Sequence, residues 1–169
     1  MQKIALAVTV ASVLALSACK KEAPAELPPA PQSTTAATTP PPGPTGPIPG
    51  SQEHFRQVVG ARGTIYFDTD MFNIDAEDQG ALREQANYLS QYPNVRATIE
   101  GHADERGTRE YNLALGERRA NAAKNYLISL GVAADRLSVV SYGKERPVAL
   151  GSDEASWARN RRAVTVVLN

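Results

Sequence analysis

Residues 101–132, GHADERGTREYNLALGERRANAAKNYLISLGV, contain the pattern that decides the fold. The run begins with a densely charged loop and continues into apolar residues that recur with helical spacing. Thr108 is a suitable N-cap and Gly131 a suitable C-terminal stop, so the run predicts a long helix over residues 108–130. The buried stripe of this helix is expected to consist of Leu113, Ala120, Ala123, Leu127 and Leu130.

Strands and helices alternate on both sides of this run. Residues 75–92 predict a second helix, and residues 153–159 predict a short one. Such an alternation favours an α/β fold with two layers, in which a sheet packs on helices. Runs rich in β-branched residues predict strands over residues 63–69, 95–101, 137–143 and 163–168.

The N-terminus is typical of an exported lipoprotein. Lys3 supplies a positive start, and residues 4–16 form an apolar run that is too short to span a bilayer as a helix. The sequence LSAC that follows resembles the bacterial lipobox, in which a signal peptidase cuts before the Cys and the Cys is acylated. Residues 1–18 are therefore predicted to be a signal peptide and Cys19 a lipidation site. An ordinary cleaved signal with an incidental Cys is the alternative.

A Pro-rich segment follows the signal. Residues 19–53, which begin with the lipidated Cys19, are predicted to form a disordered tether, because they can bury almost no apolar area. Such a segment would span roughly 30 Å as a coil and about 105 Å as polyproline II. Residues 54–169 then form one domain of ordinary size.

The composition excludes several classes of protein. Formal net charge is zero, so nucleic-acid binding is not expected. Cys19 is the only Cys, which rules out a disulfide within the chain and a Cys-rich zinc site. From residue 54 onward the cations are 13 Arg and 2 Lys. Arg suits fork-shaped binding of carboxylates and phosphates, but composition leaves open whether its partners lie inside or outside the protein.

Metal binding and catalysis have weak support. His102 and Asp104 could share a metal ion only with a third ligand, and no His-x-x-x-His helix is present. A His that orients its loop is the favoured interpretation. Ser141 and Lys144 match a Ser-x-x-Lys pattern, but the companion motifs of that enzyme class are missing. No metal, cofactor or catalytic residue is therefore expected.

A site for a small charged group has better support. Asn112 and Arg119 are seven residues apart on the predicted helix and share a face, and Asp104 lies in the loop before it. A carboxylate and a guanidinium on a rigid frame match a zwitterion, with Asp104 for an ammonium and Arg119 for a carboxylate. The alternative is an internal salt bridge, which at a surface contributes about 0–1 kcal/mol. Arg161 or Arg162 either lines the same cleft or caps the short helix.

These runs resemble a known family. Together with YFD (66–68), SYGKERP (141–147) and NRRAV (160–164), residues 101–132 resemble the peptidoglycan-associated lipoproteins, Pal, of the OmpA-C-like family. The resemblance covers residues 63–168 and implies a βαβαβ-type sandwich with a mixed sheet. It also implies a ligand, the peptidoglycan stem peptide centred on meso-diaminopimelate, whose side chain ends in a free amine and a carboxylate.

The resemblance implies specific ligand residues. They are Asp104, Arg119, Asn112 and Asp68, with His102 and Arg161 in secondary positions. Gly116 stands where the family pattern Asn-x-x-Leu-Ser-x-x-Arg-Ala has Ser, and we expect it to alter only a local hydrogen bond. Substituting Arg119 by Ala is expected to abolish wall binding and to spare the fold, because the side chain is expected to face a ligand and not the core.

Partners and location also follow from the resemblance. It implies TolB and the other Tol proteins as partners, and a role in envelope integrity and cell division. It implies a lipid-anchored protein of the outer membrane that faces the periplasm. A lipoprotein adaptor that acts mainly through protein partners is the alternative function.

Overall fold

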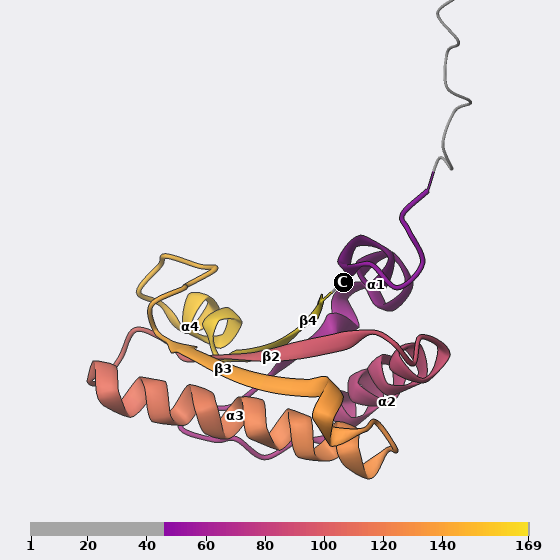
Figure 1. Cartoon of the computed structure of the whole chain (residues 1–169). Helices are drawn as coiled ribbons and strands as arrows, with labels where there is room; N and C mark the ends of the chain where they lie inside the picture. The colour runs from indigo at the N-terminus through magenta and orange to yellow at the C-terminus, as the bar shows by residue number, and fades with distance from the viewer. Residues whose placement is uncertain (1–45, 169) are drawn as a thin grey trace, which may run out of the picture. The chain divides into compact units, whose positions relative to one another are not determined.

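The computed structural model describes residues 46–168, which form an α/β domain with a four-stranded sheet (Figure 1). The predicted signal, Cys19 and most of the predicted tether lie outside the described residues. The strands are β1 (Thr64–Tyr66), β2 (Arg96–His102), β3 (Leu137–Gly143) and β4 (Arg162–Leu168). The helices are α1 (Gln52–Val59), α2 (Ala76–Gln91), α3 (Arg109–Ser129) and α4 (Glu154–Asn160), with the 3-10 turns η1 (Gly60–Gly63) and η2 (Ala134–Arg136).

The sheet is mixed, with the strand order β1-β4-β2-β3. β4 runs antiparallel to both β1 and β2, whereas β2 and β3 are parallel. Parallel neighbours need a crossover connection, and α3 supplies it. The predicted α/β fold with a mixed sheet packed on helices is confirmed.

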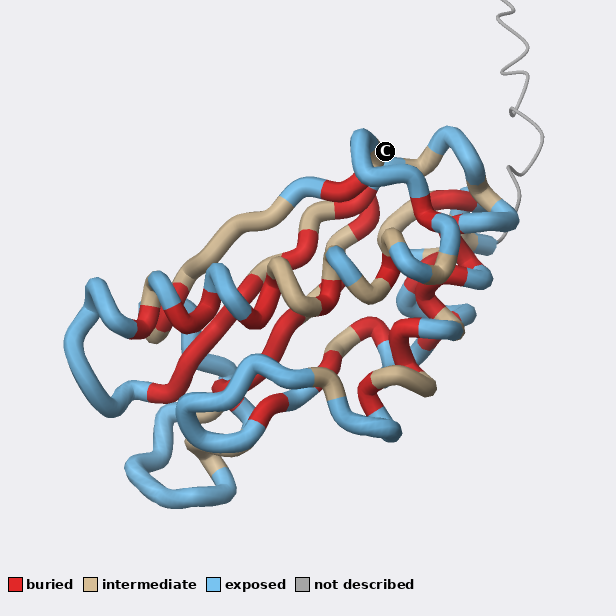
Figure 2. Tube along the Cα trace, turned by 90° about the horizontal axis from the view of Figure 1, so that it is seen from below, coloured by how far each residue is buried: buried red, intermediate tan, exposed pale blue. Residues whose placement is uncertain are grey.

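The core lies between the sheet and the pair α2 and α3. Figure 1 shows these two helices beneath the sheet, with α1 and α4 above it. Completely buried side chains meet there from all three elements: Leu82 and Leu89 of α2, Ile99 of β2, and Ala120 and Leu127 of α3. Figure 2 shows exposed residues concentrated in the loops and on the outer faces of the helices. Of the stripe predicted for the long helix, Ala120, Ala123 and Leu127 are buried as expected, whereas Leu113 and Leu130 are only half-buried. Leu115, which was not predicted, is buried as well.

α3 packs on β2 with almost no side chain between their backbones. A Cβ atom added to Gly101 would overlap the carbonyl oxygen of Gly116. A Cβ added to Gly116 would lie 2.9 Å from the carbonyl oxygen of Gly101 and would overlap the hydroxyl of Ser141. Gly116 therefore does more than alter a local hydrogen bond, since it lets the helix and the strand touch directly.

A first helix, α1, begins at Gln52, within the segment that the sequence assigns to the tether. The Ser51 side chain caps it by accepting from the backbone N–H of His54. Phe55 is 1% exposed and packs edge-on against Tyr88 of α2, with ring centroids 5.0 Å apart. No helix within residues 46–168 is long and apolar enough to cross a membrane.

β1 is shorter than the predicted strand because the chain leaves the sheet after Tyr66. The backbone N–H of Phe67 still donates to the carbonyl of Arg161, at 2.9 Å. The chain then turns, with the N–H of Met71 donating to the carbonyl of Asp68 at 3.2 Å. This turn brings residues 69 and 70 over the C-terminal end of β2.

Candidate functional site

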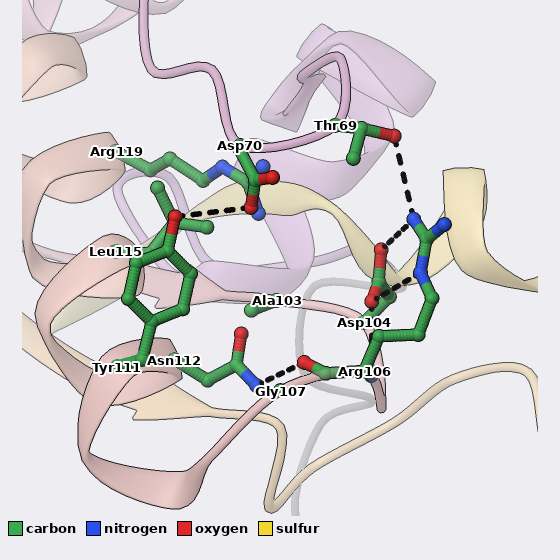
Figure 3. Close-up of a pocket in the computed structure, with 10 residues that line it drawn as sticks. All are labelled: Thr69, Asp70, Ala103, Asp104, Arg106, Gly107, Tyr111, Asn112, Leu115 and Arg119. Carbon is green, nitrogen blue, oxygen red and sulfur yellow. Dashed lines mark hydrogen bonds and ion pairs between the residues drawn. The ribbon is translucent and has the colours of Figure 1, made fainter.

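A polar cavity of about 270 Å³ lies where the C-terminal end of β2 meets the first turns of α3. Its wall consists of the loop after β1, the loop between β2 and α3, and one face of α3 (Figure 3). The main polar groups come from Asp70, Asp104, Arg106, Tyr111, Asn112 and Arg119. Charges of both signs therefore share one small enclosure.

The loop between β2 and α3 is fixed by hydrogen bonds to its carbonyl groups. Lys144 Nζ donates to the carbonyls of Glu105, at 3.1 Å, and Gly107, at 2.7 Å. Asn112 Nδ2 donates to the carbonyl of Arg106 at 2.6 Å. Gly107 has a φ of 84°, a conformation that favours glycine. This charged loop is thus a rigid wall of the cavity.

The Asp104 carboxylate is already bound by donors of the protein itself. Its Oδ1 accepts from the backbone N–H and the Nε of Arg106, each at 3.1 Å, and its Oδ2 lies 2.6 Å from Nη2 of Arg106. Nη1 of Arg161 is 3.4 Å from the same Oδ2, and the Asp104 side chain is only 8% exposed. Burial alone would raise the pKa of Asp104, but hydrogen bonds from Arg106 and Arg161, with the charge of Arg106, lower it. Asp104 is therefore a carboxylate at neutral pH.

Arg119 borders the cavity, yet it is completely buried, at 0% exposure. Its Nε, Nη1 and Nη2 donate to the carbonyls of Met71, His102 and Asp68, each at 2.9 Å. Burial, followed by the charge of Arg161, lowers the pKa of Arg119 to about 10, so it stays cationic at neutral pH. The expectation that this side chain does not face the core is wrong, because the buried guanidinium ties the loop after β1 and the end of β2 to α3.

Three predicted residues contribute without lining this cavity. Asp68 and Arg161 line a neighbouring pocket of about 310 Å³, and Arg161 reaches Asp104 from that side. His102 is 2% exposed and contributes its carbonyl to Arg119. Burial and the charges of two nearby arginines lower the pKa of His102 to about 4, so its ring is neutral at neutral pH.

Three residues outside the predicted binding set also line the cavity: Asp70, Arg106 and Tyr111. Arg106 lies over the Trp157 ring, 4.2 Å from its centroid. The spacing Asp-x-Arg-Gly is typical of an Asx turn, in which the Asp side chain accepts from the N–H two residues on, and this pattern could have revealed Arg106. Asp70 has no such local signal, because only the fold brings it to Asp104.

Ser141 and Lys144 of the Ser-x-x-Lys pattern both bind backbone carbonyls of the protein itself. Ser141 Oγ donates to the carbonyl of Leu113 at 2.7 Å, whereas Lys144 donates to the loop carbonyls described above. The two side chains therefore have separate partners. In the part of the chain that the structure describes, no group of three or more His, Cys, Asp or Glu side chains is placed to hold a metal ion.

The OmpA family profile matches residues 66–161, which is more than half of the chain and includes every polar residue of the cavity. The chain belongs to the OmpA family. The resemblance drawn from the motifs around residues 101–132 is therefore confirmed at the level of the family.

Curated relatives of this OmpA-family chain share one name. The peptidoglycan-associated lipoproteins of Rhizobium meliloti and Agrobacterium fabrum are each 58% identical to it over 119 residues. The match covers 70% of this chain and 66% of each relative, which is just under two thirds of their length.

Solved structures agree with the OmpA-family fold. The peptidoglycan-associated lipoprotein from Burkholderia pseudomallei is 50% identical with a TM-score of 0.61, covering 62% of this chain and 89% of that one. The cell wall anchor of the T6SS from Pseudomonas aeruginosa is 27% identical with a TM-score of 0.53, covering 63% of this chain and 80% of that one.

Proposed function

We propose that this chain is a non-enzymatic lipoprotein that binds peptidoglycan non-covalently and tethers the outer membrane to the cell wall. The observation that carries the proposal is the cavity, which holds carboxylates and guanidinium groups on a rigid frame. The names of the relatives support it, since proteins 58% identical to this chain are called peptidoglycan-associated lipoproteins.

The proposed ligand is the stem peptide at its meso-diaminopimelate residue. The side chain of that residue ends in an ammonium and a carboxylate on the same carbon. Asp70, Asp104 and Arg106 line the cavity, and the buried Arg119 guanidinium lies behind its wall, so a zwitterion would lie close to charges of both signs. In this proposal Asp104, Arg119, Asn112 and Asp68 build the pocket.

The proposal includes an anchor and partners. Cys19 would carry the lipids, and the segment between Cys19 and α1 would span from the outer membrane to the periplasmic domain. TolB and the other Tol proteins would share the surface around the cavity and link wall binding to cell division. Exposed apolar side chains beside the cavity support a protein partner, since Met71 is 51% and Phe72 45% exposed.

Co-sedimentation with purified cell wall tests the proposal. A chain that starts at residue 20 retains every described residue and can be mixed with diaminopimelate-type or lysine-type peptidoglycan. We expect it to pellet with the first wall and to stay largely in solution with the second. The reason is that lysine-type stems lack the side-chain carboxylate and present only an ammonium.

A matched control separates recognition from general charge. Glu110 is exposed in the first turn of α3 but does not line the cavity, so Glu110→Gln should pellet like the wild type. Equal pelleting with both walls would contradict the proposal and favour a protein adaptor. Release of soluble muropeptides during the incubation would contradict the absence of catalysis.

A further inference from the structure

We propose that the free edge of β3, together with the flank of α3 beside it, binds a second copy of this chain. The two copies would be related by a two-fold axis, and their four-stranded sheets would join into one continuous sheet. The inference concerns a surface whose residues do not line the cavity, so it does not depend on the proposed ligand.

β3 lacks the features that protect an edge strand. It is the last strand in the order β1-β4-β2-β3, so one side of its backbone has no strand partner within residues 46–168. Its sequence, LSVVSYG, contains no charged residue and no Pro, and its pairing with β2 is regular from Leu137 to Ser141. Natural proteins usually shorten, charge or bend an edge strand, because its unpaired N–H and C=O groups can pair with another chain. The edge of β3 is therefore open to strand pairing.

One flank of α3 lies beside this edge. Figure 1 shows β3 at the near edge of the sheet with α3 beneath it. Ser141 Oγ donates to the carbonyl of Leu113, whereas Tyr126, on the other side of the helix, accepts from Arg83 of α2. Residues at helical spacing from Leu113 share the flank that faces away from α2. The flank consists of Leu113, Glu117, Lys124 and Ile128, of which Glu117 is exposed and the other three are half-buried.

This flank is complementary to itself. Antiparallel pairing of two β3 strands about a two-fold axis would also make α3 antiparallel to its copy. Glu117 and Lys124 are equally far from the midpoint between residues 120 and 121, and so are Leu113 and Ile128. Each Glu117 would therefore face Lys124 of the partner subunit, and each Leu113 would face Ile128 of the partner subunit. Within residues 46–168, neither Glu117 nor Lys124 forms an ion pair.

The strand and the helix agree on the position of the axis. Ser141 lies against Gly116, because a Cβ added to Gly116 would overlap the Ser141 hydroxyl. A helix rises about 1.5 Å per residue and a strand about 3.3 Å, which puts the midpoint of the flank about level with Val139. Val139 is also the centre of the regular segment from Leu137 to Ser141. One two-fold axis near Val139 thus serves both elements and opposes no like charges.

The symmetry identifies the partner. A strand without charges, beside a flank with one charge of each sign, matches a copy of itself better than a strongly acidic or basic protein. The antiparallel arrangement would also place the two cavities at opposite ends of the joint sheet. One dimer would therefore present two separate sites.

Sedimentation equilibrium with charge variants tests the proposal. We expect the chain that starts at residue 20 to form dimers as its concentration rises. Glu117→Lys or Lys124→Glu alone should weaken dimerisation by about tenfold or more, because the axis makes each change oppose like charges twice. An equal mixture of the two variants should dimerise about as well as the wild type, since one flank then carries only cations and the other only anions. Arg118→Glu, on a face turned away from β3, is the matched control and should behave like the wild type.

A cross-link tests the geometry independently. The chain from residue 20 contains no Cys, so an introduced Cys is the sole thiol. Asn121→Cys lies next to the proposed axis and should give a disulfide-linked dimer on mild oxidation. Asn125→Cys, one turn further along α3 and exposed, should give little. Thermal unfolding checks that every variant keeps the fold.

Three results would overturn the proposal. A wild type that stays monomeric at every concentration would leave the edge of β3 to an extended segment of another protein. A mixture of the charge variants that dimerises no better than each variant alone would exclude the opposed flanks of α3. Equal cross-linking of Asn121→Cys and Asn125→Cys would place the interface elsewhere.

Discussion

Individual arginines of this domain mainly hold its own loops. Four arginines each donate to at least one backbone carbonyl of a distant or neighbouring loop: Arg119, Arg136, Arg161 and Arg162. Arg136 alone reaches the carbonyls of three residues between the end of α2 and the start of β2. A guanidinium offers five donors in a planar fork, whereas an ammonium offers three from one atom. At these four positions the partners of the guanidinium lie inside the protein.

Replacing Arg119 by Ala is expected to destabilise the fold. Three carbonyls would lose their donor in a site with no exposure to water, and a cavity would remain in place of the side chain. We expect the free energy of unfolding in urea to fall by about 3 kcal/mol or more. An unchanged unfolding midpoint would show that the loops do not depend on this guanidinium. Lost wall binding in Arg119→Ala is therefore informative only beside a stability measurement.

Asp78 makes stability depend on pH. Burial, together with the charges of Asp75 and Glu77, raises its pKa from 3.8 to about 6, against the effect of a hydrogen bond from the N–H of Tyr66. Its Oδ2 is buried and has no hydrogen-bond partner within residues 46–168. The folded state therefore binds this proton more tightly than the unfolded chain. The resulting stability is fully present below about pH 4 and is lost as the pH rises through 6.

Asp78→Asn should remove this dependence. It keeps the acceptor for Tyr66 and removes the buried charge, so above pH 7 we expect it to unfold at higher urea than the wild type. The difference should reach up to about 3 kcal/mol and vanish near pH 4. The lowered pKa of His102 changes the pH dependence of stability in the opposite direction, but it does so equally in the wild type and in the variant. The difference in unfolding free energy between the two proteins therefore reports on Asp78 alone. A constant difference across this range would contradict the assignment.

At the scale of the elements, the contact between β2 and α3 positions the site. Gly101 is the last residue but one of β2, and Gly116 lies in the second turn of α3. Their direct contact sets how closely α3 lies on the sheet. The cavity lies just beyond this contact, where the chain passes from β2 to α3.

Adding one methyl group at this contact should be costly. Gly101→Ala would force α3 away from β2, and we expect the free energy of unfolding to fall by about 1–3 kcal/mol. Gly80→Ala is the control, because nothing lies within 4 Å of a Cβ at this position in α2. There, higher helix propensity should add about 0.5–1 kcal/mol. Equal midpoints for the two variants in thermal unfolding would contradict the close contact.

Elements with clear local signals could be predicted from the sequence, whereas elements without such signals were missed or given wrong limits. The long helix was predicted within about a residue at each end, because Thr108 and Gly131 mark its limits. α1 was missed because it follows a Pro-rich segment and buries only Phe55 and Val59. β1 was predicted too long, since the residues after it look like a strand but turn to close the cavity.

Some residues of the candidate site could likewise be predicted from the sequence, and others could not. Asp104, Asn112 and Arg119 could be placed together because one loop and one helix contain them, and the structure brings all three to the cavity. The burial of Arg119 could not be predicted, since it depends on a loop about 50 residues earlier in the chain. The position of Asp70 in the cavity could not be predicted for the same reason. Its proximity to Tyr111 arises only when the sheet forms.

The chain enters the domain beside α1, at one end of the sheet (Figure 1), and the cavity lies at the opposite end. α1 lies at the end where β2 begins, because Gln52 accepts from the N–H of Val167, whose partner on β2 is Ala97. The cavity lies at the other end of β2, beyond His102. β2 thus runs from the region of α1 to the cavity.

This arrangement has a mechanical consequence. A pull between Gly46 and a ligand held in the cavity would run along the strands. The chain from Gly46 enters the sheet at β1, so such a pull loads the hydrogen bonds between β1 and β4 in shear. The bonds over the three residue pairs of these strands must break together before the strands slide. A pull across the strands would open the same bonds one after another. The domain is therefore built to resist force in the direction in which an anchored chain would transmit it.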